Sequence, residues 1–177
     1  QKSRSNAIIY LPAPEKVTQY MLQNLDIDYS DFIFVDYGSG KGRVLLVASN
    51  FPFQKIIGVE ISKKLHRIAK KNITLYKNDD QKCTNFELLC MNALEFIPPA
   101  ADTVFHFYHP FLPEVLEPVL RNIEKFLKTH SVKIYILYLY HVDFVAAVFE
   151  EMEFLERIKE VKCVNSQYNW ALYTNRI

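Results

Sequence analysis

Short apolar runs alternate with helical patterns along most of the sequence. The apolar runs predict strands at residues 32–36, 55–60, 86–91, 103–108 and 132–140. Between these runs, apolar residues recur at every third or fourth position, which predicts amphipathic helices. Three predicted helices begin after Pro14, Gly42 and Ser62. Two more occupy residues 113–128 and 142–151. The strand predicted at 132–140 is apolar with little alternation, which is typical of a central strand covered on both faces.

The C-terminal part of the chain predicts a different arrangement. Residues 154–164 and 170–174 predict two strands joined at Asn165-Ser166-Gln167, a pattern that favours an antiparallel hairpin. The strand–helix repeats before it predict a parallel sheet with helices on both faces. We therefore expect an α/β fold, with a doubly wound, mostly parallel, seven-stranded sheet that ends in the hairpin.

We expect one domain over residues 1–177, with a lid segment and the first helix in residues 1–30. The lid is expected from Tyr10 and the prolines that follow it; the alternative is a stiff surface linker. One face of the first predicted helix is apolar. It carries Val17, Tyr20, Met21 and Leu25.

Glycine is scarce and unevenly placed. The chain has four glycines, of which Gly38, Gly40 and Gly42 lie within five residues, directly after a predicted strand and before a predicted helix. Glycine is used where the backbone takes a positive φ or where a ligand comes close. A strand, a glycine-rich turn and a helix N-terminus together predict a nucleotide-type binding corner at the carboxyl end of the sheet.

Two other glycine-rich loops fit the sequence less well. A phosphate-binding P-loop ends in Gly-Lys-Ser/Thr, whereas here Lys41 precedes Gly42 and Arg43 follows it. The dinucleotide fingerprint needs glycine at its sixth position, which Arg43 occupies. An NAD-dependent oxidoreductase therefore stays as an alternative interpretation of this loop.

Two segments together resemble a known family. The run from Asp36 to Gly42 resembles motif I of the class I S-adenosylmethionine-dependent methyltransferases, and Gly58-Val59-Glu60 resembles their second motif. The resemblance covers about residues 10–175 and implies a Rossmann-like fold, S-adenosylmethionine as cofactor and methyl transfer as the activity. Glu60 lies 24 residues after Asp36, a spacing that fits the family.

The resemblance implies a set of cofactor contacts. The amides of the glycine turn suit the carboxylate of the cofactor, and Asp36 suits its ammonium, directly or through water. Glu60 suits the ribose hydroxyls, Ile61 an adenine face and Asn92 the adenine edge. The expected cofactor-binding residues are Asp36, Gly38, Ser39, Gly40, Gly42, Glu60, Ile61, Asn92 and Ala93.

The acceptor side is expected after the strand at 103–108. Tyr108 and His109 are the expected catalytic residues, and His109 can accept or shuttle a proton because its ordinary pKa is near neutrality. Pro110, Phe111 and Tyr10 are the expected substrate-binding residues. Amino-methylating relatives often carry an amide or acid followed by Pro-Pro here, and this chain departs from that pattern.

Composition limits the partners. The net charge of +1 creates no strong field toward nucleic acid or anionic membranes. No apolar stretch approaches the roughly 20 residues that span a bilayer, and no signal-peptide pattern is present. Three widely spaced cysteines without a CxxC pair are typical of reduced thiols, so we expect a cytoplasmic protein without a metal site. The chain opens at Gln1 and need not begin at the start of the protein.

The methyl acceptor is left open by the sequence. A protein side chain such as lysine is slightly favoured over a small molecule or RNA. A catalytically silent S-adenosylmethionine-binding protein is a further alternative, because motif IV lacks its usual amide. One predicted helix also carries a basic stripe, which suits either a solvated face or an acidic partner. The stripe comprises Lys63, Lys64, Arg67, Lys70 and Lys71.

Overall fold

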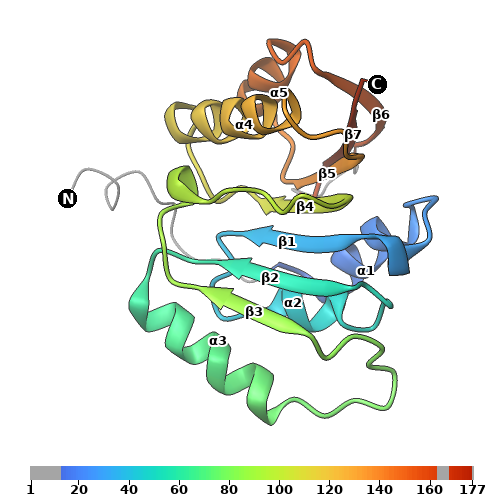
Figure 1. Cartoon of the computed structure of the whole chain (residues 1–177), viewed down its shortest axis with the longest axis vertical. Helices are drawn as coiled ribbons and strands as arrows, with labels where there is room; N and C mark the ends of the chain where they lie inside the picture. The colour runs from blue at the N-terminus through green and yellow to red at the C-terminus, as the bar shows by residue number, and fades with distance from the viewer. Residues whose placement is uncertain (1–12, 163–167, 177) are drawn as a thin grey trace.

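The computed structural model describes residues 13–162 and 168–176. Tyr10 and the predicted turn at 165–167 lie outside the described residues. The described chain folds into a seven-stranded sheet with the strand order β3-β2-β1-β4-β5-β7-β6 (Figure 1). The strands are β1 (Ile33–Tyr37), β2 (Lys55–Val59), β3 (Phe86–Leu89), β4 (Thr103–Tyr108), β5 (Ile134–Leu139), β6 (Leu155–Val161) and β7 (Trp170–Asn175).

The pairing of the strands confirms the predicted α/β sheet. Strands β1 to β5 pair in parallel, whereas β7 is antiparallel to both β5 and β6. The order reverses between β1 and β4, since the chain first builds β1, β2 and β3 outward and then returns to β4. The carboxyl ends of β1 and β4 therefore lie side by side, which is where such sheets bind ligands.

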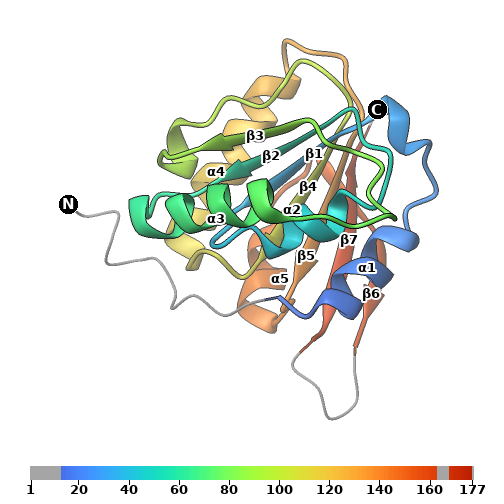
Figure 2. The ribbon, with the colours of Figure 1, turned by 90° about the horizontal axis from the view of Figure 1, so that it is seen from below.

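Helices cover the two faces of the sheet and enclose two apolar cores. Residues of α1 and α2 pack in one core and residues of α4 and α5 in the other (Figures 1 and 2). The α-helices are α1 (Glu15–Gln23), α2 (Arg43–Ala48), α3 (Lys63–Leu75), α4 (Pro113–Leu127) and α5 (Asp143–Glu150). Single 3-10 turns are η2 (Tyr29–Asp31) and η3 (Ala93–Glu95), and the latter lies between β3 and β4.

Most predicted elements are confirmed with shifts of one to two residues at their ends. The predicted strand 103–108 coincides with β4, whereas the strand predicted at 132–140 shortens to Ile134–Leu139. Tyr20 belongs to the apolar face predicted for the first helix, yet its side chain is 51% exposed. Its ring meets the edge of Trp170 at the periphery, with centroids 6.1 Å apart, while Met21 and Leu22 fill the core.

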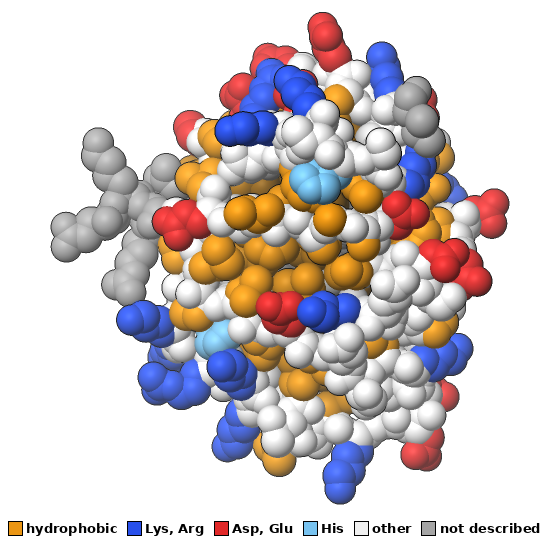
Figure 3. Space-filling model, viewed as in Figure 1, with side chains coloured by type: hydrophobic (Ala, Val, Ile, Leu, Met, Phe, Trp, Pro, Cys, Tyr) orange, Lys and Arg blue, Asp and Glu red, His pale blue; other side chains and the backbone are white. Residues whose placement is uncertain are grey.

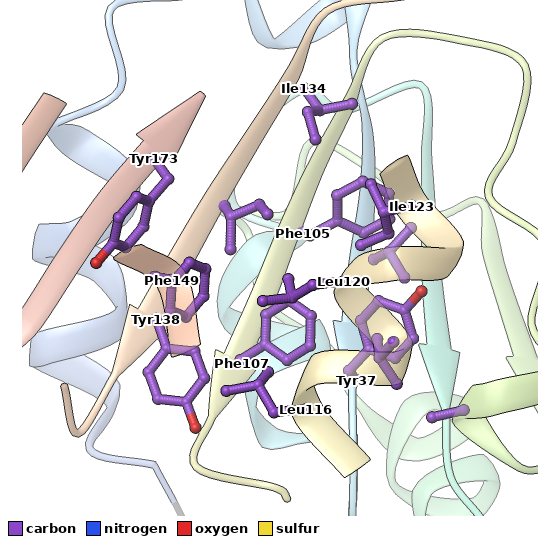
Figure 4. Packing of buried hydrophobic residues seen from close by; sticks show 14 of the residues in the cluster. Tyr37, Phe105, Phe107, Leu116, Leu120, Ile123, Ile134, Tyr138, Phe149 and Tyr173 are labelled. Carbon is purple, nitrogen blue, oxygen red and sulfur yellow. The ribbon is translucent and has the colours of Figure 1, made fainter. Parts of the chain in front are cut away.

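Aromatic residues stiffen the core directly beneath the carboxyl ends of the strands. The Tyr37 ring stacks on Phe107 with centroids 4.8 Å apart, and Phe107 stacks on Tyr138 at 5.8 Å (Figure 4). These three residues come from β1, β4 and β5, so their rings form one row across adjacent strands. Buried aromatic pairs add about 0.5–1.5 kcal/mol beyond the burial of their area. The row holds the neighbouring loops on a rigid base.

Candidate functional site

The glycine loop connects β1 to α2 in a tight, left-handed path. Gly38, Gly40 and Gly42 have φ values of 75°, 55° and 83°. A Cβ placed on Gly38 would lie only 2.6 Å from Cβ of Pro110. The loop after β1 therefore touches the loop after β4, and glycine at position 38 is what allows this contact. The structure thus brings the expected cofactor loop and the expected acceptor loop together.

The backbone amides of this loop are already engaged within the protein. Gly38 and Ser39 both donate to the carbonyl of Val59, at 2.9 and 3.1 Å, and Gly42 donates to the carbonyl of Ser39 at 2.8 Å. Gly40 donates to the Glu60 carboxylate at 2.9 Å. A bound carboxylate can reach these amides only by replacing one of these bonds. The glycines contribute mainly the space left by their missing side chains.

Glu60 joins the ends of two strand–helix connections. Its Oε2 accepts from the Gly40 amide, and its Oε1 accepts from the Ser62 amide at 2.7 Å. Burial raises the pKa of Glu60, and the hydrogen bonds from the Ser62 and Gly40 amides oppose that rise. Each carboxylate oxygen has two lone pairs, so Glu60 retains capacity to accept from a ligand hydroxyl. This capacity matches the pair of ribose hydroxyls expected from sequence.

Asp36 has a partner that the sequence pattern did not reveal. Its Oδ1 lies 2.7 Å from Nδ1 of His106, the residue directly opposite it in the register of β1 and β4. Both side chains are buried, and burial raises the pKa of Asp36, whereas the hydrogen bond from His106 lowers it. His106 Nε2 is buried without a hydrogen-bond partner among the described residues. No role for His106 was expected from sequence, although two polar residues in neighbouring apolar strands were a usable signal.

The residues expected near the adenine have mixed surroundings. The Asn92 side chain accepts a hydrogen bond from the Leu94 amide at 3.1 Å and so caps η3. Ala93 is buried in the core beneath the sheet edge, and Ile61 is half-buried. The Met91 amide donates to the Glu60 carbonyl, so the ends of β2 and β3 lie next to each other. Asn92 and Glu60 therefore share one edge of the site.

His109 lies among aromatic rings at the ends of β4 and β5. It has a φ of 39° and Tyr140 has a φ of 67°, and these are the described non-glycine residues with positive φ. Their rings are 4.9 Å apart, and the Phe144 ring is 5.5 Å from His109. His109 Nδ1 lies 3.3 Å from the Tyr138 hydroxyl. Burial lowers the pKa of His109, which favours the neutral imidazole.

The positive φ values of His109 and Tyr140 are strained backbone conformations, which cost about 1–3 kcal/mol each and concentrate at functional sites. We name the group of His109, Tyr138, Tyr140 and Phe144 the His109 cluster. The ring of Phe144 is 46% exposed, so one side of the cluster is open to solvent. The sequence favours core packing for Tyr138 and Tyr140, with an aromatic substrate wall as the alternative, and it gives Phe144 no role. Tyr138 is fully buried, as core packing predicts.

The other acceptor-side residues are divided between two faces. Tyr108 packs at the margin of the core under α1 and α2, and burial raises the pKa of its hydroxyl. The Phe111 ring lies 6.4 Å from Tyr37 on the opposite face, where it holds the loop to the core. Pro110 contacts Gly38. Of the two expected catalytic residues, His109 alone belongs to the His109 cluster.

Comparison with known proteins places this geometry in a family. A family model described as a putative methyltransferase matches residues 30–108, which include the glycine loop, Glu60 and β4. The matched segment is that of a methyltransferase family and spans less than half of the chain. A protein-lysine N-methyltransferase of Saccharolobus islandicus is 38% identical over 65 residues, which cover 36% of this chain and 40% of the relative. The matched part thus spans less than half of that relative.

Solved methyltransferase structures share the fold over nearly the whole chain. An RNA methyltransferase from Salinibacter ruber, in complex with S-adenosyl-L-homocysteine, has a TM-score of 0.60 and 22% identity, covering 93% of this chain and 92% of that one. A SAM-dependent O-methyltransferase from Thermotoga maritima has a TM-score of 0.65 and 11% identity, covering 95% and 67%. At such low sequence identities, these two comparisons show a shared fold.

A cavity lies beside the glycine loop, on the side of α1, α2 and α3. Its volume is about 280 Å³, and it is lined by Glu15, Lys41, Arg43, Leu46, Val47, Asn72 and Tyr76. None of the expected cofactor-binding residues lines it, but Lys41 and Arg43 of its lining flank Gly42. Among the described helices, none combines the length and apolar character needed to cross a membrane.

Proposed function

We propose that this protein transfers a methyl group from S-adenosylmethionine to the side-chain amine of a protein lysine. The observation that carries the cofactor assignment is the position of Glu60, whose buried carboxylate bridges the Gly40 and Ser62 amides at the carboxyl edge. A carboxylate with free lone pairs beside a glycine loop fits a ribose. The carboxylates of Asp36 and Glu60 suit a cofactor that carries positive charge. The close approach of Gly38 to Pro110 suits a cofactor whose reactive group lies near the loop after β4.

The bound cofactor supplies an electrophilic methyl group on a positively charged sulfur. Glu60 holds the ribose, with Ile61 and Asn92 beside the adenine. Asp36 and its partner His106 form the floor beneath the glycine loop. We expect Gly38, Ser39, Gly40, Gly42 and Ala93 to shape the cradle through their small size and turn geometry. Positioning of reactants in such a site can account for about 7–11 kcal/mol of a barrier.

The His109 cluster provides the acceptor side of the proposal. Aromatic faces attract an ammonium group and pack on an aliphatic chain, and a lysine side chain offers both. The amine must be neutral to react, and a neutral His109 can accept its proton. The lowered pKa of His109 keeps it in the receptive form at neutral pH. The relative described as a protein-lysine N-methyltransferase supports the same acceptor class.

The test is methyl transfer from labelled S-adenosylmethionine to a cell extract, followed by acid hydrolysis and amino-acid analysis. The proposal predicts label in methyl-lysine in the protein fraction and its loss in a Glu60→Ala variant. Label in RNA or in small molecules would contradict the lysine assignment but preserve methyl transfer. Absence of transfer with intact cofactor binding would instead support a silent cofactor-binding protein.

A further inference from the structure

We infer that the solvent-facing side of α3 is a docking surface for an acidic segment of the protein substrate. This inference rests on the proposed protein acceptor and adds how that acceptor is recognised. We name the surface the α3 basic face. It comprises five exposed cations, Lys63, Lys64, Arg67, Lys70 and Lys71.

The α3 basic face is a local concentration of charge in a nearly neutral protein. The whole chain carries a net charge of +1, yet residues 63–77 contain no Asp or Glu. Within the described ranges, none of the five cations pairs with a carboxylate. Figure 3 shows Lys and Arg side chains gathered at the lower left, where α3 lies in Figure 1. Their positive potential is therefore not neutralised by neighbouring side chains.

The packing of α3 leaves this face available. Ala69 is the one buried residue of the helix, and it lies against Gly42 of the glycine loop. The basic positions project from the opposite side of the helix, since residues 63, 67, 70 and 71 share one face at 3.6 residues per turn. Ser62 caps the N-terminus of the helix, and its amide donates to Glu60. The N-terminus of α3 therefore adjoins Glu60, so a peptide bound along α3 would lie next to the proposed cofactor site.

The dimensions of the α3 basic face favour a short peptide over nucleic acid. Residues 63–71 extend over about 12 Å at 1.5 Å per residue, which matches about four residues of an extended chain. The α3 basic face contains one arginine and no aromatic residue. Single-stranded RNA is usually held by stacking on aromatic rings, and RNA-binding domains are usually strongly basic overall. A cluster of Glu or Asp side chains fits this surface best.

The experiment measures binding of a short fluorescein-labelled oligoglutamate peptide to the full chain by anisotropy at low salt. We expect binding that the double variant Arg67→Glu/Lys71→Glu weakens at least about tenfold. The control Lys125→Glu/Lys128→Glu makes the same change in net charge on α4 and should leave binding nearly unchanged. Unchanged affinity for S-adenosylmethionine in both variants separates this result from the proposed function, which concerns a different surface.

Three outcomes would overturn the inference. One is the absence of oligoglutamate binding by the unmodified chain. A second is equal weakening by both double variants, which would indicate a response to overall charge. A third is tighter binding of a labelled oligouridylate than of oligoglutamate through Arg67 and Lys71, which would assign the α3 basic face to nucleic acid.

Discussion

His106 Nδ1 lies 2.7 Å from Asp36 Oδ1, and both side chains are buried. A buried pair of this kind is costly to break from one side, because the remaining group keeps its desolvation cost. Since β1 and β4 place the two residues in direct register, the pair also ties together the strands that lead to the two loops of the site.

Replacement of His106 by Leu should therefore destabilise the fold strongly. We expect a loss of about 3–5 kcal/mol in the free energy of unfolding, measured by urea denaturation, because Asp36 is left buried without its partner. The double variant Asp36→Leu/His106→Leu should recover part of this loss. If the losses of the two single variants simply add in the double variant, the two residues do not act as a pair.

Substitution of Gly38 by Ala tests the contact between the two loops. The positive φ alone costs about 1–2 kcal/mol, and the new methyl group would also meet Pro110. Gly42→Ala is the matched control, because its φ is similar and its nearest contact, Ala69, is at 3.3 Å. Denaturation should show the larger loss for Gly38→Ala, and Pro110→Gly should relieve the difference. Equal losses for the two variants would mean that the Pro110 contact is unimportant.

Loss of the Glu60 carboxylate should weaken the cofactor. Two hydrogen bonds to a charged group would disappear in Glu60→Ala, so affinity for S-adenosylmethionine should fall about tenfold to a hundredfold. The control is Glu95→Ala, which removes an exposed carboxylate of η3. Calorimetric titration measures both variants. An affinity in Glu60→Ala equal to that of the unmodified chain would remove Glu60 from the site.

His109 should set the acid side of the pH–rate profile. Its pKa is lowered below the usual 6.5, so it stays neutral until the pH falls under that value and the rate should decline only there. His109→Asn should lower kcat and remove this limb, while the fold tolerates it because asparagine accepts a positive φ. An unchanged acid limb in His109→Asn would show that another group titrates.

Phe144 should contribute to the acceptor without supporting the fold. Because its ring is 46% exposed, Phe144→Ala should change the free energy of unfolding by less than about 1 kcal/mol. The KM for the acceptor should rise several-fold, since the His109 cluster loses one wall. Ile97→Ala, at a position 78% exposed between η3 and β4, is the control and should leave the KM unchanged. Equal KM values for both variants would place the acceptor elsewhere.

Sequence periodicity was sufficient for the sheet and for the positions of Gly38, Glu60 and His109 at its strand ends. The strand ends predicted from apolar runs located Gly38, Glu60 and His109 correctly, because a parallel sheet brings its carboxyl ends to one side. The Asp36–His106 pair was not predictable in this way, since it depends on the register between strands distant in sequence. The His109 cluster likewise depends on backbone conformation at His109 and Tyr140, which no spacing reveals.

The acceptor half stays less determined for a physical reason. The proposed cofactor site uses one set of charges and one glycine turn, which leave a local sequence pattern. The proposed acceptor surface, the His109 cluster, combines residues from the ends of β4 and β5 and from α5. A single aromatic residue in sequence does not indicate whether it faces the core, as Phe111 does, or the solvent, as Phe144 does.

The most direct test of the central claim is calorimetric titration of the full chain with S-adenosylmethionine and, separately, with NAD. The account predicts saturable binding of S-adenosylmethionine to one site, strongly weakened in Glu60→Ala, and no binding of NAD. Tight binding of NAD with no response to S-adenosylmethionine would contradict it.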